Sequence, residues 1–212
     1  MVNIEKLIFN NFQENTYLLY DETGDCVVVD PGCYGPDEEQ LLSSVIRSHG
    51  LKPVRLLNTH CHVDHILGNN YVSKTYGLTP EIHKEGLPFL KNAHEHARIY
   101  GFVMDPLTEP VHFLTDGEKI GFGRSELEVL YTPGHADGSV CFVCKSDKFV
   151  ISGDVLFRDS IGRTDLPTGD FEALMESIHQ KLFVLDDVYA VYCGHGPETT
   201  IGYEKANNPF IR

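Results

Sequence analysis

The order in which strand-like and helix-like segments follow one another constrains the fold of this chain most. Short runs with the composition of strands come in groups, and the first three are expected at Ile4–Ile8, Tyr17–Tyr20 and Cys26–Asp30. An amphipathic segment from Pro36 to Gly50 then predicts a helix, because proline suits a first turn and glycine a helix end. Strands in runs, with helices between the runs, favour layers of sheet and helix over a strict alternation.

Length and composition predict one folded domain over residues 1–212. The chain has 212 residues, enough for one sizeable core, and its 42% hydrophobic and 23% charged residues are typical of globular proteins. No apolar run approaches the roughly 18 residues of a membrane span. The first residues do not combine a basic region with an apolar stretch, as a signal peptide does. We therefore expect a cytoplasmic protein.

The net charge argues against several classes of partner. The formal charge is −14, and the 17 Lys and Arg residues are scattered along the chain. A protein this acidic repels phosphate backbones and anionic membrane surfaces. We therefore expect no nucleic-acid partner and no membrane partner. Two divalent metals would add about four positive charges at one place, so the charge of the whole chain would not describe such a pocket.

The six cysteines are expected to be reduced, because a chain without an export signal seldom forms a disulfide framework. Cys141 and Cys144 have the spacing of a redox or zinc pair. They lie within Ser139–Lys145, which alternates like a strand and would place residues i and i+3 on opposite faces. We expect them to be small buried apolar side chains.

A dense group of metal-binding side chains follows the apolar segment Val54–Asn58. His60 and His62 are two residues apart, so in an extended segment they project to the same side. Asp64 and His65 come after a turn and can reach back toward them. Imidazole and carboxylate together suit zinc, iron or manganese. The segment predicts a metal site at the end of a strand.

Three more candidate ligands, His135, Asp154 and His195, each come directly after a glycine that follows a strand-like segment. Loops at strand ends can converge on one edge of a sheet, and glycine lets the backbone turn a ligand inward. Six residues cannot complete two metal sites, so these three are candidates for the rest. The other histidines are expected to be structural or surface residues: His49, His83, His94, His96, His112 and His179.

The pattern His-x-His-x-Asp-His at residues 60–65, followed in order by the three later ligands, resembles the metallo-β-lactamase superfamily over nearly the whole chain. The resemblance implies an α/β fold, a four-layer αβ/βα sandwich in a single domain, with two metals at one edge. It also implies how the ligands are shared. They are His60, His62 and His135 for one metal, Asp64, His65 and His195 for the other, and Asp154 as the bridge.

Two segments narrow the resemblance to the glyoxalase II-like branch, and both contain runs typical of it: residues 153–170 and 194–210. The chain looks like the short, single-domain type II proteins of bacteria. It ends at Arg212, so we expect no C-terminal helical domain of the kind that helps the larger enzymes bind glutathione. In that branch a basic residue after the Gly-Asp segment contacts the glutathione part of the substrate. By motif this residue is Arg163, our candidate for substrate binding.

The resemblance implies a hydrolase with two divalent metals, for which zinc is our expectation and iron or manganese the alternatives. The metals would share a water, lower its pKa towards about 7, and so provide a hydroxide that attacks a carbonyl. A small-molecule thioester suits this chemistry because its leaving thiolate has a parent pKa of about 8.5. The expected reaction is hydrolysis of a hydroxyacyl thioester such as S-lactoylglutathione, with Asp64 and Asp154 as the catalytic carboxylates.

Three other functions remain open. One is a sulfur (persulfide) dioxygenase with a single iron, a relative that also carries a Gly-Arg-Thr-Asp-like segment. The second is a hydrolase of another ester or thioester, although Asp154 at the bridging position is unlike true β-lactamases. The third is an inactive binding or regulatory module, against which the intact set of ligands argues. The sequence leaves the oligomeric state unknown.

Overall fold

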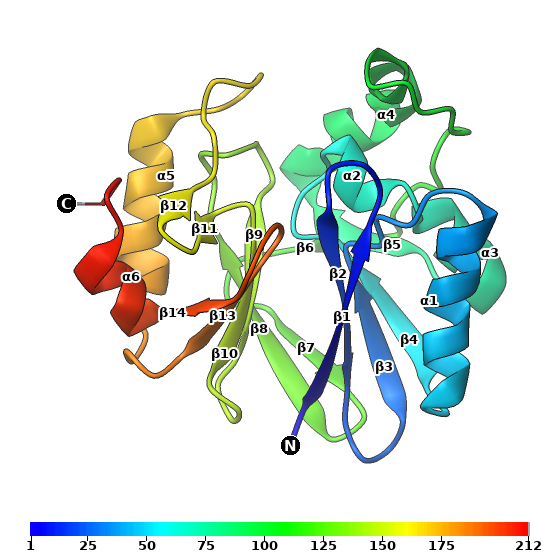
Figure 1. The fold of residues 1–212 in the computed structure, drawn as a ribbon, viewed down its shortest axis with the longest axis horizontal. Coiled ribbons are helices and arrows are strands. Elements are labelled where there is room, and N and C mark those ends of the chain that lie inside the picture. The colour runs from blue at the N-terminus through cyan, green and yellow to red at the C-terminus, as the bar shows by residue number, and fades with distance from the viewer. Residues whose placement is uncertain (212) are drawn as a thin grey trace.

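The computed structural model describes residues 1–211, in which two β-sheets pack face to face with helices on both outer faces (Figure 1). Arg212, the last residue of the expected domain, lies outside the described residues. The helices of the first half are α1 (Pro36–Ser48), α2 (Val63–Ile66), α3 (Asn69–Tyr76) and α4 (Leu87–Ile99); those of the second half are α5 (Phe171–Ser177) and α6 (Ile201–Asn207). These layers confirm the αβ/βα sandwich that the resemblance implied.

The first sheet has the strand order β1-β2-β3-β4-β5-β6. Its strands are β1 (Asn3–Phe9), β2 (Glu14–Tyr20), β3 (Asp25–Val29), β4 (Lys52–Leu57), β5 (Pro80–His83) and β6 (His112–Leu114). The first three form an antiparallel meander, whereas β3 to β6 run parallel because helical connections return the chain to the same end of the sheet. The residues that follow β3 and β4 therefore meet at one edge.

The second sheet has the order β14-β13-β10-β9-β8-β7. Its strands are β7 (Lys119–Phe122), β8 (Ser125–Tyr131), β9 (Val140–Cys144), β10 (Phe149–Gly153), β13 (Ala190–Cys193) and β14 (Thr199–Thr200). Strands β10 and β13 are parallel, and β9 is antiparallel to both β8 and β10. Strands β8, β10 and β13 therefore end at the same edge. A small hairpin, β11 (Leu156–Phe157) and β12 (Ser160–Ile161), follows β10.

The core lies in three layers, one between the sheets and one beneath the helices of each half. Strands β3, β9 and β10 are buried along almost their whole length, as strands covered on both faces must be. Cys144 packs with residues between the sheets, whereas Cys141 packs on the other face with residues of α5 and α6. This confirms that the pair lies on opposite faces. All six cysteines are buried and free.

The pattern of Ile66–Tyr76, which is followed by Gly77, predicts one helix, but the structure has two shorter helices in this region, α2 and α3. The chain enters α2 already at Val63, so Asp64 and His65 lie in a helical turn and not in an irregular one. Gly68 then separates α2 from α3, and its backbone N–H donates to the carbonyl of Pro31 at 2.7 Å. A Cβ at Gly68 would lie 2.4 Å from Cys33 Sγ, so only glycine allows this approach.

The amphipathic segment Phe171–Phe183 predicts a helix with Asp170 as its N-cap, and α5 begins there: the carboxylate of Asp170 accepts from the N–H of Ala173 at 3.0 Å. The helix continues as a π-helical turn over Ile178–Leu182. Within residues 1–211 no helix combines the length and the apolar character that crossing a bilayer requires.

Candidate metal centre

All seven candidate ligands meet at one edge of the two sheets. His60 and His62 follow β4, and Asp64 and His65 lie in α2. The other three follow strands of the second sheet: His135 after β8, Asp154 after β10 and His195 after β13. Both halves of the fold therefore contribute to one cluster, because their strands end at the same edge.

The first group of ligands consists of three histidines. His60, His62 and His135 each offer a ring nitrogen within 4.8 Å of the others. The Nε2 of His135 lies 2.9 Å from the Nδ1 of His62, and the Nε2 of His60 is buried without a hydrogen-bond partner. These three nitrogens point at one another, as ligands of a common cation do.

The second group consists of Asp64, His65 and His195, whose ligand atoms also lie within 4.8 Å of one another. The Oδ2 of Asp64 lies 3.1 Å from the Nε2 of His195 and 3.6 Å from the Nε2 of His65. His65 is completely buried and its Nε2 has no hydrogen-bond partner. This group can hold a second cation.

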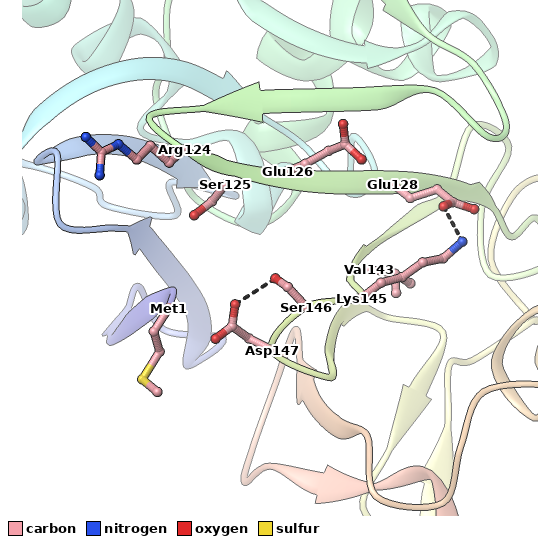
Figure 2. Close-up of a pocket in the computed structure, with 9 residues that line it drawn as sticks. All are labelled: Met1, Arg124, Ser125, Glu126, Glu128, Val143, Lys145, Ser146 and Asp147. Atoms are coloured by element: carbon pink, nitrogen blue, oxygen red, sulfur yellow. Dashed lines mark hydrogen bonds and ion pairs between the residues drawn. The ribbon is translucent and has the colours of Figure 1, made fainter.

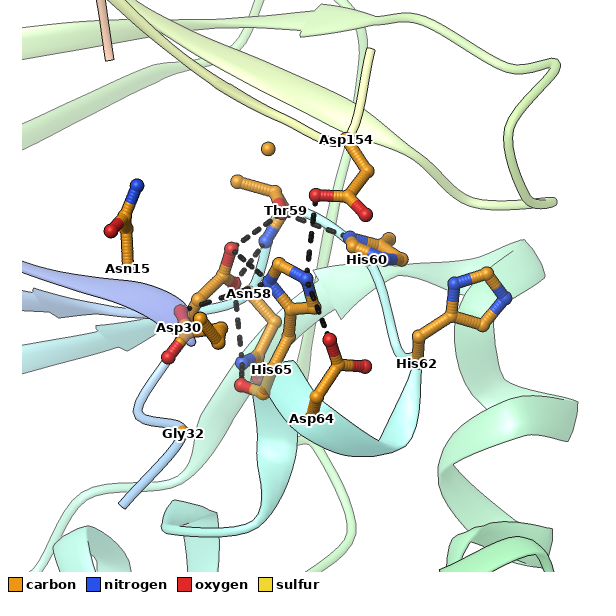
Figure 3. Close-up of polar contacts among 12 residues, drawn as sticks. Asn15, Asp30, Gly32, Asn58, Thr59, His60, His62, Asp64, His65 and Asp154 are labelled. Carbon is orange, nitrogen blue, oxygen red and sulfur yellow. Dashed lines mark hydrogen bonds and ion pairs between the residues drawn. The ribbon is translucent and has the colours of Figure 1, made fainter. Parts of the chain in front are cut away.

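Asp154 lies between the two groups. Its Oδ1 is 3.4 Å from the Nε2 of His65, and its Oδ2 is 3.6 Å from the Nε2 of His135 and 3.7 Å from that of His195. Figure 3 shows its carboxylate facing the ring of His65 from the side opposite Asp30. The geometry therefore suits a carboxylate that bridges two cations.

In four of the ligand histidines, the Nδ1 of the ring contacts another polar group of the protein. The Nδ1 of His135 donates to the carbonyl of Arg163 at 2.8 Å, and that of His195 to the carbonyl of Phe12 at 3.1 Å. The Nδ1 of His65 lies 3.2 Å from Asp30 Oδ2. Each of these contacts leaves the Nε2 lone pair for a metal, which is how proteins orient ligating imidazoles.

The fourth histidine is His60, whose Nδ1 contacts the hydroxyl of Thr59. This hydroxyl donates to Asp30 Oδ2 at 2.6 Å, so its oxygen is left to accept from the Nδ1 of His60 at 3.1 Å. The backbone N–H of Thr59 donates to Asp30 Oδ1 at 2.7 Å. Asp30 lies close enough to His60 and His65 to be a ligand, but both its oxygens already accept hydrogen bonds. We therefore interpret it as a residue that orients the ligands and does not bind metal itself.

The donor set fits divalent metals. His60 Nε2, His65 Nε2 and Asp154 Oδ1 are buried and unpaired, which is costly unless a cation satisfies them. Burial lowers the pKa of His60, and it lowers that of His62 to about 4, so these imidazoles are neutral and ready to bind. Burial acts to raise the pKa of Asp154, but the neighbouring histidines outweigh it and keep the group a carboxylate.

The structure places the substrate-binding candidate Arg163 beside the centre, but not with a free side chain. Its guanidinium is exposed and forms two hydrogen bonds with Asp165, at 2.7 and 2.8 Å. Its backbone carbonyl is the acceptor for His135. The main chain of Arg163 therefore contacts the ligand shell, while its side chain lies at the surface.

Sequence reasoning missed the residues that hold the ligands, above all Asp30 and Asn15. The signal that the sequence offers for Asp30 is its place at the end of a strand-like segment, which resembles that of the later ligands. In the structure it directly follows the buried strand β3 and has a positive φ of 48°. Nothing local marks Asn15, because its partners lie about 180 residues later in the chain.

The other histidines lie outside the centre. Among residues 1–211, the groups able to hold a metal contain none of the six histidines expected to be structural or surface residues. His83, for example, stacks on the ring of Tyr131 with ring centroids 4.3 Å apart. His112 pairs with Glu118 at 2.6 Å.

Two surface clefts lie away from the candidate centre. One, of about 470 Å³, runs along β8 and β9 and is bordered by Met1, Glu128 and Lys145 (Figure 2). The other, of about 460 Å³, lies between α1, α3 and the segment around Met104. Neither contains one of the seven candidate ligands.

Comparisons with known proteins agree with this geometry. The family model for the metallo-beta-lactamase superfamily matches residues 10–195. Hydroxyacylglutathione hydrolase GloC of Haemophilus influenzae is 35% identical over 212 residues, which cover 99% of this chain and 98% of the relative.

Two solved structures each have a TM-score of 0.88. TTHA1623, in a di-iron-bound form, is 36% identical and the match covers 97% of this chain and 99% of that one. BLEG-1, a B3 metallo-beta-lactamase, is 35% identical, with coverages of 100% and 99%. The chain belongs to the metallo-β-lactamase superfamily.

Proposed function

We propose that this protein is a metal-dependent hydrolase that cleaves a hydroxyacyl thioester such as S-lactoylglutathione. The observation that carries the proposal is the position of Asp154 between two groups of three ligands, 3.4–3.7 Å from histidines of both. The similarity to a hydroxyacylglutathione hydrolase over 99% of this chain supports the choice of substrate class.

The two groups would hold two divalent cations. In this proposal the ligands are His60, His62 and His135 for the first, Asp64, His65 and His195 for the second, and Asp154 for both. Imidazole and carboxylate donors accept zinc, iron or manganese, and supply in the cell often decides among them. A structural relative in a di-iron-bound form makes iron as strong a candidate as zinc.

The cations would lower the pKa of a shared water and polarise a carbonyl oxygen. The chain itself supplies the rest. Asp154 and Asp64 have pKa values held low by the histidines around them, against the effect of burial, so both are carboxylates at neutral pH. Asp64 is 16% exposed, so it can act as a proton acceptor as well as a ligand. A leaving thiolate needs little help from a general acid.

Substrate binding is assigned to Arg163. Its guanidinium can contact a carboxylate of the thiol part of the substrate once its contact with Asp165 opens. An exposed ion pair of this kind contributes about 0–1 kcal/mol, so an anionic substrate can compete for it. We further propose that the protein acts in the cytoplasm, where its six free thiols would remain reduced, and that it has no nucleic-acid or membrane partner.

The direct test is a substrate panel on metal-loaded protein. S-lactoylglutathione is followed by loss of thioester absorbance, beside other acyl thioesters, simple esters and a chromogenic β-lactam, which the similarity to a named β-lactamase makes necessary. Asp154→Ala is the inactive control, and Asp186→Ala, at an exposed site, is the matched active one. Turnover of the β-lactam alone would overturn the thioester assignment.

Metal content and oxygen uptake separate the dioxygenase alternative. Two metals per chain and thioester turnover without oxygen consumption support the hydrolase. One iron per chain, with oxygen consumed when a persulfide is added, would replace it. A protein that binds no metal and is unaffected by chelators would favour a binding module.

A further inference from the structure

The hairpin formed by β1 and β2 belongs to the first sheet, yet it contacts the loop that carries His195 in the second. The Nδ1 of His195 donates to the carbonyl of Phe12, in the turn of this hairpin, at 3.1 Å. By contrast, His135, which also follows a strand of the second sheet, donates to the carbonyl of Arg163, a residue of the same half of the fold. The position of His195 is therefore set from across the two halves.

Asn15 makes three of these cross-contacts, and Tyr17 adds another, since its hydroxyl donates to the carbonyl of Cys193 at 2.6 Å. The Nδ2 of Asn15 donates to the carbonyls of Cys193 and Gly196, at 2.9 Å each, and its backbone N–H donates to the carbonyl of Gly194 at 2.8 Å. Asn15 is only 1% exposed. One buried amide thus uses both of its hydrogens on the carbonyls that flank His195.

The loop that Asn15 holds has little room to move. A Cβ at Gly194 would lie 2.2 Å from Asp154 Oδ1 and 2.8 Å from His65 Cε1. The backbone therefore passes directly against the bridging carboxylate and a ligand of the second group. A small displacement of this loop would move His195 away from Asp64 while leaving the first group in place.

Asn10 ties the same hairpin to the other side of the second group. Its Nδ2 donates to the backbone carbonyls of Asp64 and Gly32 at 3.0 Å each, and its Oδ1 accepts from the N–H of Phe12 at 2.9 Å. The turn that offers its carbonyl to His195 is thus fixed to the chain that carries Asp64.

We infer that Asn15, assisted by Asn10, is a positioning residue for the second metal: it sets the distance between His195 and the ligands Asp64 and His65. The inference rests on the proposed two-metal centre. The first group has no comparable contact with this hairpin, because His60 is held by Thr59 and His135 by Arg163. Loss of the Asn15 amide should therefore weaken one metal position and spare the other.

The test is a metal titration of the full chain with Zn²⁺ and with Co²⁺, whose visible spectrum reports the geometry of each site. For Asn15→Ala we expect the second metal to bind about 10- to 100-fold more weakly, the range seen when a group that orients a metal ligand is removed, and the first metal to bind as before. Asn10→Ala, at a half-buried position, should show the same selectivity and serves if Asn15→Ala folds poorly.

Asn208→Ala is the matched control. Asn208 is also 1% exposed and its Nδ2 also donates two hydrogen bonds, to Ser160 O at 3.0 Å and Glu204 Oε2 at 2.8 Å, but it lies away from the ligands. It should lower the melting temperature of the apoprotein and leave both metal affinities unchanged. Equal weakening of both metals in Asn15→Ala, or no weakening, would overturn the inference alone. Failure of the unaltered protein to bind two metals would overturn the proposed function as well.

Discussion

The Oδ2 of Asp30 lies 3.2 Å from the Nδ1 of His65, and both side chains are almost completely buried. The same carboxylate accepts from the backbone N–H and the hydroxyl of Thr59. Because Thr59 in turn contacts His60, Asp30 links one ligand of each proposed metal to the end of β3. It therefore helps to orient His65 directly and His60 through Thr59.

Replacing Asp30 should weaken both metals. In Asp30→Ala the imidazole of His65 loses its acceptor and the N–H of Thr59 is left buried and unpaired, so we expect affinity to fall about 10- to 100-fold. The unpaired group should also destabilise the fold by about 1–3 kcal/mol. Isothermal titration with Zn²⁺ and thermal melts measure the two effects. Asp25→Ala, at the other end of the same strand, is the control and should retain both metals.

The two groups should differ in the protons that they release on binding metal. Burial lowers the pKa of His60, His62 and His135, so these bind as neutral imidazoles at pH 7. At His65 and His195 the neighbouring carboxylates outweigh burial and raise the pKa, so protons must leave before a metal binds. We expect on the order of one to two protons released for two metals bound at pH 7.

Calorimetry in two buffers with different ionisation enthalpies measures this release. The affinity for the second metal should rise as the pH increases above 6.5, the ordinary pKa of histidine, because His65 and His195 lose their protons above that value. The affinity for the first should stay nearly constant until the pH approaches about 4, the pKa of His62. A proton count of zero at pH 7 would contradict the assignment of charge to the second group.

Asp21 should stabilise the fold without affecting the centre. It lies just beyond the end of β2 opposite Asn15 and accepts from the N–H of Arg124 at 2.7 Å and the hydroxyl of Ser125 at 2.9 Å, which joins the two halves. Asp21→Ala leaves the N–H of Arg124 unpaired, so we expect a loss of about 1–3 kcal/mol in unfolding free energy. Metal content should not change, and Asp186→Ala, at an exposed site that does not contact Arg124, should match the unaltered protein in both measurements.

The effect at Asp21 should depend on pH in a defined direction. Hydrogen bonds outweigh burial and lower the pKa of this carboxyl below the value of about 3.9 that it has in an unfolded chain. Its contribution is therefore complete above pH 4 and is lost as the pH falls toward the pKa of the folded state. Thermal melts of both proteins at pH 7 and pH 3 should show the gap between them narrowing on acidification.

The ligands themselves could be predicted because their signals are local. His60 to His65 lie within six residues, and each later ligand directly follows a glycine at a strand end. The layers of the fold could be predicted for the same reason, since strands and helices are read from neighbouring residues.

The residues that orient the ligands could not be predicted, because they depend on contacts between segments that are distant in the sequence. Asn15 meets Cys193 across 178 residues, and Asp30 meets His65 only after β3 and β4 have paired in parallel. The break between α2 and α3 could not be predicted for a similar reason. It lies at Gly68, whose N–H donates to the carbonyl of Pro31, and the hydrophobic periodicity of residues 60–70 does not report this contact.

Arg163 gives the most direct test of the proposed substrate. In Arg163→Ala the carbonyl that accepts from His135 remains, so metal content should not change. The lost side chain should raise KM for S-lactoylglutathione up to about fivefold, the equivalent of the roughly 1 kcal/mol of an exposed ion pair, with kcat unchanged. Asp165→Ala should lower KM, because it frees the guanidinium, and Arg158→Ala, exposed in the same region, should change neither constant. An unchanged KM in Arg163→Ala and Asp165→Ala would remove Arg163 from the binding site and leave the metal centre intact.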